Sequence, residues 1–306
     1  MHKRTLLAAT TLLALPLAAA PLLLRAQDPP MPATATPPAA PAAQSVPLRY
    51  KWTVGQSRCY KITMTMTGTI PTGTSGTRIP MNMAMQMVMR QTVKSVQSGD
   101  GAATIVSQIE STRMAMNGKE MPMTAAQQAP MKKPITTEML PSGKIVSLQM
   151  PGLGATVMPG MDIGKSLMGN TLAFPDGLVK VGDTWNGALG AGMMGMQMGM
   201  ASTLMGLETR NGAQVATIGQ KITGDLSGMA NKSMPAGMGM TGKISGTGSM
   251  VFDTTAGALV SQSLQNAIDM TIIAKPGAPA GVPPAMNVQM QQTMLMERLP
   301  DAAPAR

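Results

Sequence analysis

The sequence contains very few aromatic or imidazole side chains. Its 306 residues include two Trp, two Tyr and two Phe, and its one histidine is His2. Because His2 lies in the N-terminal targeting segment, the rest of the chain has no imidazole for a Ser-His-Asp triad or a zinc site. Proteins that bind single-stranded nucleic acid stack bases on aromatic rings, so nucleic acid is not expected as a partner. These absences exclude the commonest hydrolase and zinc-site designs.

Cysteine and clustered carboxylates are also scarce. Cys59 is the single cysteine, so no disulfide can form within the chain. Its strand-like neighbours favour a buried, unreactive thiol, and an intermolecular bridge is the alternative. The acidic residues are dispersed, with Asp100, Asp176 and Asp253 near expected turns. No two are close enough in sequence to indicate an acid and base pair, and a pair brought together by the fold is the alternative. We therefore predict no enzymatic activity, no catalytic residues, no cofactor-binding residues and no cofactor.

The N-terminus has the pattern of a secretory signal peptide, with a basic head and an uncharged apolar run at residues 5–24. We predict cleavage after Ala26, a signal peptide at 1–26 and export to the periplasm or the extracellular space. An uncleaved anchor is the alternative.

Residues 27–46 are rich in Pro and Ala, and this composition predicts a disordered linker. Loss of Lys3, Arg4 and Arg25 would lower the formal charge from +10 to +7, which we interpret as a solubility feature, with contact to an anionic surface as the alternative.

What the chain has in abundance is methionine, 35 residues in all. Met81, Met83, Met85, Met87 and Met89 occupy every second position. Successive side chains on a β-strand point to opposite faces, so all five thioethers would lie on one face and be mostly buried, with Asn82, Gln86 and Arg90 facing solvent. The same spacing recurs at Met64, Met114, Met196 and Met290. It predicts a mainly β protein with long antiparallel strands.

Three landmarks occur twice in the same order, which predicts two related halves. They are Val54-Gly55 and Val181-Gly182, then the hairpin turns Asp100-Gly101 and Asn211-Gly212, then Ser142-Gly143 and Ala256-Gly257. We predict a first β unit at residues 47–150, a connecting segment at 151–178, a second β unit at 179–299 and a disordered tail at 300–306. The two halves would form a curved sheet, a half-barrel or a sandwich behind an N-terminal signal helix.

A family resemblance rests on the second of these units. The heptapeptide Val179 to Trp185, the Asn211-Gly212 hairpin and the strand from Phe252 to Ser261 resemble a family of bacterial exported β-rich proteins with a V-x-V-G-D-T-W element. Because this family has no established catalytic residues, the resemblance implies no activity. More remotely, the long curved strands are similar to the half-barrel carriers of bacterial envelopes, which hold lipids or lipoproteins.

Three functions fit these features. The first is an exported binding or carrier module for an apolar ligand such as a lipid. The second is a structural or interaction protein of the cell surface with a packed methionine core and an envelope protein as partner. The third is Cu(I) binding by thioethers. Membrane contact is expected only through the signal segment or peripherally. The candidate residues that line an apolar site are Met81, Met83, Met85, Met87, Met89, Met290, Met294 and Met296, and the copper candidates are Met196, Met198, Met200, Met238 and Met240.

Overall fold

The structure is a computed structural model, and it describes residues 44–72, 77–150, 173–189, 197–226, 237–274, 276–277 and 283–300. The predicted signal peptide, most of the predicted linker, Met196 and residues 301–306 lie outside these ranges. The described residues belong to one compact unit that spans residues 43–306.

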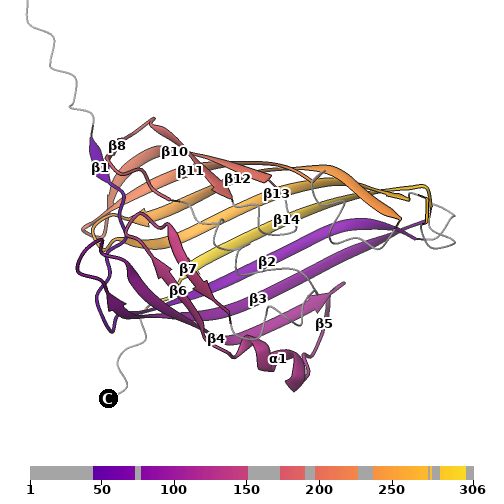
Figure 1. The fold of residues 1–306 in the computed structure, drawn as a ribbon, viewed down its shortest axis with the longest axis horizontal. Helices are drawn as coiled ribbons and strands as arrows, with labels where there is room; N and C mark the ends of the chain where they lie inside the picture. The colour runs from indigo at the N-terminus through magenta and orange to yellow at the C-terminus, as the bar shows by residue number, and fades with distance from the viewer. Residues whose placement is uncertain are drawn as a thin grey trace, which may run out of the picture. The chain divides into compact units, whose positions relative to one another are not determined.

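A large curved antiparallel sheet dominates this unit (Figure 1). In the described part of the chain it contains twelve strands, in the order β7-β6-β4-β3-β2-β14-β13-β12-β11-β10-β9, with β5 paired to β4. The sheet is open, and β7 and β9 form its edges. Its strands are β2 (Ser57–Thr72), β3 (Thr77–Val96), β4 (Ala103–Met116), β5 (Lys119–Glu120), β6 (Ile135–Met139), β7 (Ile145–Gln149), β9 (Thr184–Leu189), β10 (Gln197–Arg210), β11 (Ala213–Asp225), β12 (Met238–Asp253), β13 (Ala258–Ala274) and β14 (Ala285–Arg298).

Two further strands and a short helix complete the described structure. Strand β1 (Ser45–Pro47) pairs with β8 (Leu178–Lys180) as a separate two-stranded ribbon. Helix α1 (Ala125–Met131) lies between β5 and β6. Within the residues that the structure describes, no helix is long and apolar enough to cross a bilayer.

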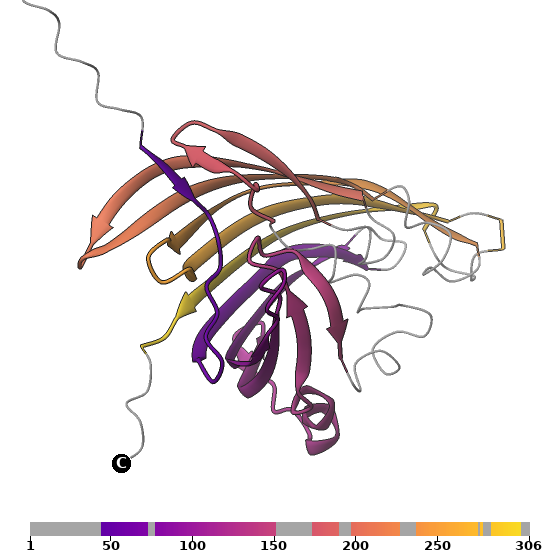
Figure 2. The ribbon, with the colours of Figure 1, turned by 60° about the vertical axis from the view of Figure 1, so that its left-hand side comes forward.

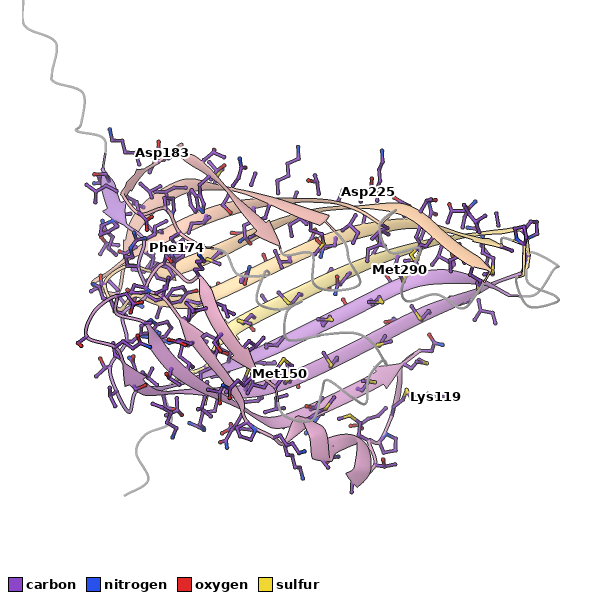
Figure 3. All side chains as sticks on the ribbon, viewed as in Figure 1. Lys119, Met150, Phe174, Asp183, Asp225 and Met290 are labelled. Carbon is purple, nitrogen blue, oxygen red and sulfur yellow. The ribbon has the colours of Figure 1, made fainter. Side chains whose placement is uncertain are left out.

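The strand registers place the methionines of β14, β2, β3 and β4 on one face of the sheet, as their spacing predicts. Met294 of β14 lies opposite Met64 of β2, which lies opposite Met85 of β3, which lies opposite Met114 of β4. Residues directly opposite each other in antiparallel strands point to the same face. Yellow sulfur atoms accordingly follow β14, β2 and β3 in Figure 3. We call this surface the methionine face.

The other face of the sheet is polar. The residues beside the methionines in the same strands are mostly Thr, Ser, Gln and charged residues, among them the cross-strand pairs Glu297 with Lys61 and Lys243 with Asp269. This division gives the long strands their register, because a slip by one residue would exchange the two faces.

The two halves begin with equivalent turns. The Gly55 N–H donates a hydrogen bond to the Val93 carbonyl at 2.9 Å, and the Gly182 N–H donates to the Leu204 carbonyl at 2.8 Å. Both glycines have a positive φ, 81° and 94°, which costs glycine little. From these turns the chain runs through β2, β3, β4, β6 and β7 in the first half and through β9 to β13 in the second, and β14 joins β13 to β2. The two halves are therefore parts of one continuous sheet.

Residues 48–56, which we call the strap, connect the two halves at one end of the sheet. The Tyr50 N–H donates to the Pro141 carbonyl at 2.7 Å, and the Lys51 N–H donates to the Gly257 carbonyl at 3.0 Å. Pro141 lies in the turn between β6 and β7, and Gly257 in the equivalent turn between β12 and β13. The strap therefore holds together two turns that lie far apart in the order of strands, and Figure 2 shows the sheet curving between them.

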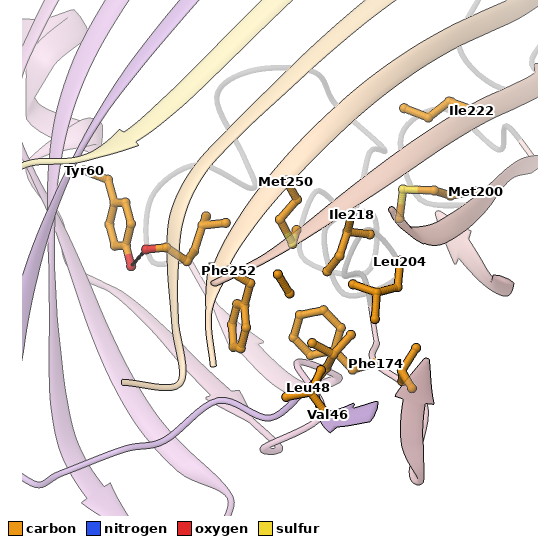
Figure 4. Packing of buried hydrophobic residues seen from close by; sticks show 13 residues of the cluster. Val46, Leu48, Tyr60, Phe174, Met200, Leu204, Ile218, Ile222, Met250 and Phe252 are labelled. Carbon is orange, nitrogen blue, oxygen red and sulfur yellow. Dashed lines mark hydrogen bonds between the residues drawn. The ribbon is translucent and has the colours of Figure 1, made fainter. Parts of the chain in front are cut away.

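The main core fills this end (Figure 4). Phe252 and Leu204 are fully buried in it, with Phe174 at 3% exposure. Rings of Tyr50, Phe174 and Phe252 contact one another with centroids 4.9–5.6 Å apart, and Trp52 stacks on Tyr50 at 5.1 Å. Tyr60 and Trp185 belong to or pack against the same cluster. The few aromatic residues are thus gathered at one end, and methionine lines the rest of the face.

The structure departs from two of the expectations. Strand β1 begins at Ser45 and buries Val46, so the last residues of the predicted linker are ordered by their pairing with β8. The methionines from Met81 to Met89 are half-buried rather than buried, and so are Gln86 and Arg90. The reason is geometric: the sheet is open, and the main core packs against its other end.

Candidate ligand-binding site

A cavity of about 770 Å³ lies on the methionine face, beside the main core. The walls come from β2, β3, β4, β6 and β7 on one side and from β10 to β14 on the other. The curvature of the sheet brings these strands around the same space. The cavity is partly open to solvent, and its size falls within the usual range for small-molecule sites.

Flexible apolar side chains make up most of the wall. The methionines among them are Met66, Met139, Met198, Met200, Met240, Met250, Met270, Met294 and Met296. Isoleucines and leucines such as Ile222, Ile244 and Leu264 fill the spaces between them, and Tyr50, Trp52 and Tyr60 form the closed end. Unbranched thioether side chains adapt their shape readily, so this wall can fit apolar molecules of different shapes.

The structure places the predicted lining residues in two groups. Met294 and Met296 line the cavity. Met290 and the methionines from Met81 to Met89 share the same face of the sheet but lie outside the cavity wall. Met290 and Met81, both opposite Gly68, extend the apolar surface toward the far ends of β2, β3 and β14, whereas Met89 lies opposite Tyr60 at the core end. Met290 marks this extension in Figure 3.

Three of the copper candidates also line the cavity. These are Met198 and Met200 of β10 and Met240 of β12. Met238 begins β12 two residues before Met240 and therefore lies on the same face of the sheet. Met196 lies outside the described residues.

The cavity wall carries no Asp, Glu, Lys or Arg among the residues described. Two of the carboxylates predicted near turns accept hydrogen bonds within those turns. Asp100 accepts from the Ala102 N–H at 3.0 Å, and Asp253 accepts from the Ala256 N–H at 2.8 Å. Within the described ranges, no group of three His, Cys, Asp or Glu could hold a metal ion. The site therefore offers apolar contacts and neutral hydrogen-bonding groups.

Tyr50 is the titratable side chain at the closed end whose environment is most altered. Burial raises the pKa of its hydroxyl above the ordinary value, the neighbouring Tyr60 raises it further, and Arg58 opposes the shift. A tyrosine hydroxyl is uncharged at neutral pH, and the raised pKa keeps that of Tyr50 uncharged in alkali as well.

Side-chain amides on two neighbouring strands line the cavity, and the sequence analysis did not identify them as site residues. Gln262 and Asn266 of β13 and Gln292 of β14 line the wall. The Asn266 Nδ2 donates to Gln292 Oε1 at 3.3 Å, and the Gln262 Nε2 donates to Oε1 of the buried Gln220 at 3.2 Å. The alternation of side chains along the strands could have identified them, because these amides occupy positions on the face where the other residues are mostly apolar.

Sequence comparisons find no match. No family model matches the chain, and no curated protein is similar to it in sequence. Membership of the family suggested by the heptapeptide Val179 to Trp185 thus stays an expectation.

Structural comparisons find remote similarity. Lipovitellin, solved in a study of its lipid–protein interactions, aligns over 84% of this chain with 10% identity and a TM-score of 0.48. This alignment covers 26% of the lipovitellin chain. A LolA-superfamily protein from Nitrosomonas europaea aligns over 83% of this chain and 90% of its own, with 8% identity and a TM-score of 0.17. A DUF1329-family protein from Desulfovibrio piger aligns over 82% of this chain and 88% of its own, with 9% identity and a TM-score of 0.12. Similarity at these levels carries no argument about the ligand.

Proposed function

We propose that this protein is an exported, non-enzymatic binding or carrier module for an apolar ligand. The observation that carries the proposal is the cavity itself, which combines a volume of about 770 Å³ with a wall of Met, Ile and Leu and no charged side chain among the residues described. Removing apolar surface from water is worth about 25 cal/mol per Å², so an aliphatic molecule gains free energy along the whole of such a wall.

The extended apolar face supports a long ligand. From Met296 in the cavity to Met290 beyond it, β14 advances six residues, or about 20 Å at about 3.3 Å per residue. A single acyl chain spans about 15 Å in half of a bilayer core. The open far end of the sheet would then be the entrance, because the strap and the aromatic cluster occupy the other end. A fully packed core, which the structural-protein alternative requires, fits this cavity poorly.

Binding of a fluorescent, uncharged apolar probe such as N-phenyl-1-naphthylamine tests the proposal. We expect saturable binding to the wild-type protein, and at least a tenfold loss of affinity in Met294→Trp because a large ring would occupy the cavity. The matched control is Leu295→Trp, since Leu295 is 39% exposed and its position alternates with that of Met294. Absence of saturable binding, or equal affinities in the two variants, would contradict the proposal.

Cu(I) binding is the second candidate, favoured by the approach of Met198, Met200 and Met240 to one cavity from two different strands. Thioether sulfur is a soft ligand that selects Cu(I). The triple replacement of these residues by Leu conserves most of the apolar volume. Under this candidate the variant loses stoichiometric Cu(I) uptake, and unchanged uptake would clear these residues of the role.

A further inference from the structure

We propose that the site selects ligands whose polar part is uncharged, and that it holds an ester, amide or hydroxyl group against the amide row formed by Gln262, Asn266 and Gln292. This inference rests on the proposed function, because it specifies the class of apolar ligand that the cavity accepts.

The amide row lies in the middle of the apolar surface. Asn266 is directly opposite Gln292, and Gln262 is directly opposite Met296 in the pairing of β13 with β14. Apolar positions continue on both sides of this row, from Ile268 and Met290 toward the open end to Leu259 toward the core, and Met250 lies directly opposite Gln262. A ligand that lies along the strands would therefore meet the amides partway along its length rather than at its tip.

Hydrogen bonding within the row is incomplete. In the described part of the chain, the Asn266 Oδ1 has no partner, and neither do the Gln220 Nε2 behind the row and the Trp52 Nε1 at the closed end. The Gln292 Nε2 donates to the Met64 Sδ at 3.5 Å, and a thioether is a weak acceptor. Buried polar groups are normally satisfied, so the weakly bonded Gln292 Nε2 is the donor of the row that a ligand oxygen could take over.

Glycines in the neighbouring strand make room for the row. A Cβ at Gly246 would lie 2.1 Å from the Asn266 Oδ1, and a Cβ at Gly248 would lie 2.4 Å from the Leu264 Cδ2. The side chains of β13 therefore lie down over the bare backbone of β12. This arrangement sets the amide of Asn266 into the wall instead of blocking the cavity.

The absence of charged groups in the described wall decides which polar group fits. A carboxylate or phosphate in the cavity would be a buried charge without a partner, which is much more costly than a hydrogen-bonded neutral group. Charged side chains of the same strands, such as Lys243 and Asp269, pair with each other in register on the polar face of the sheet. A neutral ester can accept a hydrogen bond from a side-chain amide, and a neutral amide can both donate and accept, with no charge left over.

Competition between ligands that share an 18-carbon chain and differ in the group at its end tests the inference. At pH 8, oleamide, methyl oleate, oleate and 1-octadecene would each displace N-phenyl-1-naphthylamine from the full-length protein. We expect oleamide and methyl oleate to compete at least tenfold better than oleate and 1-octadecene. In Gln292→Leu this advantage should fall below threefold while binding of the probe and of octadecene persists.

The control variant is Gln291→Leu, because Gln291 is the exposed neighbour in the same strand and should leave the preference unchanged. Gln262→Met serves as a second cavity variant if Gln292→Leu fails to fold, and probe binding reports that folding. If oleate competes as well as oleamide, or if the Gln292→Leu protein keeps the wild-type preference for oleamide and methyl oleate, the inference is wrong while the proposed function stands. Absence of probe binding in the wild-type protein would instead overturn the proposed function.

Discussion

Arg58 is a buried charge, 6% exposed, held by oxygen atoms and an aromatic ring. Its guanidinium donates to the Lys51 carbonyl at 3.2 Å and to the Ala256 carbonyl at 3.4 Å, and it lies 5.4 Å from the centre of the Trp52 ring. Because Lys51 belongs to the strap and Ala256 to the turn between β12 and β13, one side chain links the two halves.

We predict that Arg58→Met lowers the free energy of unfolding by about 2–3 kcal/mol, the range for hydrogen bonds made by a charged group. Arg58→Lys should be intermediate, since lysine cannot reach several oxygens with a fixed fork. Urea denaturation measures the effect, and Arg113→Met at an exposed position should change stability by less than about 0.5 kcal/mol. Equal stabilities of the Arg58 and Arg113 variants would contradict this role.

The raised pKa of the Tyr50 hydroxyl predicts that the folded protein loses stability in alkali. Burial raises the pKa of its hydroxyl in the folded protein, whereas the unfolded chain releases this proton near pH 10. Below pH 10 both states keep the proton. Above it, the unfolded state alone ionises at first, so stability should fall by about 1.4 kcal/mol per pH unit from this group. Tyr50→Phe should melt with a shallower dependence on pH between 9 and 11, and identical slopes would rule out this residue as the cause.

At the scale of the element, turns depend on glycine to different degrees. Gly257 combines a φ of +57° with a missing Cβ that would lie 2.4 Å from the Lys51 nitrogen, Gly55 has a φ of +81° in open space, and Gly99 has neither constraint. Replacement by Ala should therefore cost about 3 kcal/mol at Gly257, about 1 kcal/mol at Gly55 and less than about 0.5 kcal/mol at Gly99. Thermal denaturation of the three variants measures this order, and a reversed order would refute the strap contact.

The half-burial of β3 sets the expected effect of a charge on its methionine face. Met85→Asp should destabilise the protein by about 1–2 kcal/mol, at the low end for an uncompensated polar group because water reaches the site. Asn82→Asp, at an exposed position on the other face, is the control and should be nearly neutral. If both variants unfold at the same urea concentration, the methionine face contributes nothing to stability.

At the scale of the whole molecule, the described strands should differ in stability along their length. The main core and the ring contacts of the described residues lie at the strap end, whereas a smaller cluster of Leu226, Met240 and Ile244 lies toward the far ends of β11 and β12. Local opening is favoured where few buried contacts exist. Hydrogen exchange should therefore be slowest near Tyr60, Ile218 and Phe252 and faster near Gly68 and Met81. Uniform exchange rates along β2 would contradict this gradient.

A saturating oleamide concentration, about 100 times its dissociation constant, should add about 2.7 kcal/mol to the free energy of unfolding and slow hydrogen exchange beyond the core.

Local patterns determined much of this protein in advance. The alternation from Met81 to Met89 specified strands with one apolar face, because side-chain direction in a strand depends only on parity. The paired glycine turns at Gly55 and Gly182 indicated that a similar series of strands occurs twice, because the residues of a turn themselves determine whether it needs a positive φ. Those features are properties of short segments, and the registers and backbone angles agree with them.

Other features depended on contacts between residues far apart in the sequence. The strap joins Tyr50 to Pro141 and Lys51 to Gly257, and no local pattern contains a hydrogen bond across some ninety or two hundred residues. Curvature then decided which methionines face a cavity, so that Met294 and Met296 line it while Met85 only extends the apolar surface. The amides of Asn266 and Gln292 became a site because register places them opposite each other. Parity selects a face of the sheet, but only the packing of distant strands encloses a space on that face.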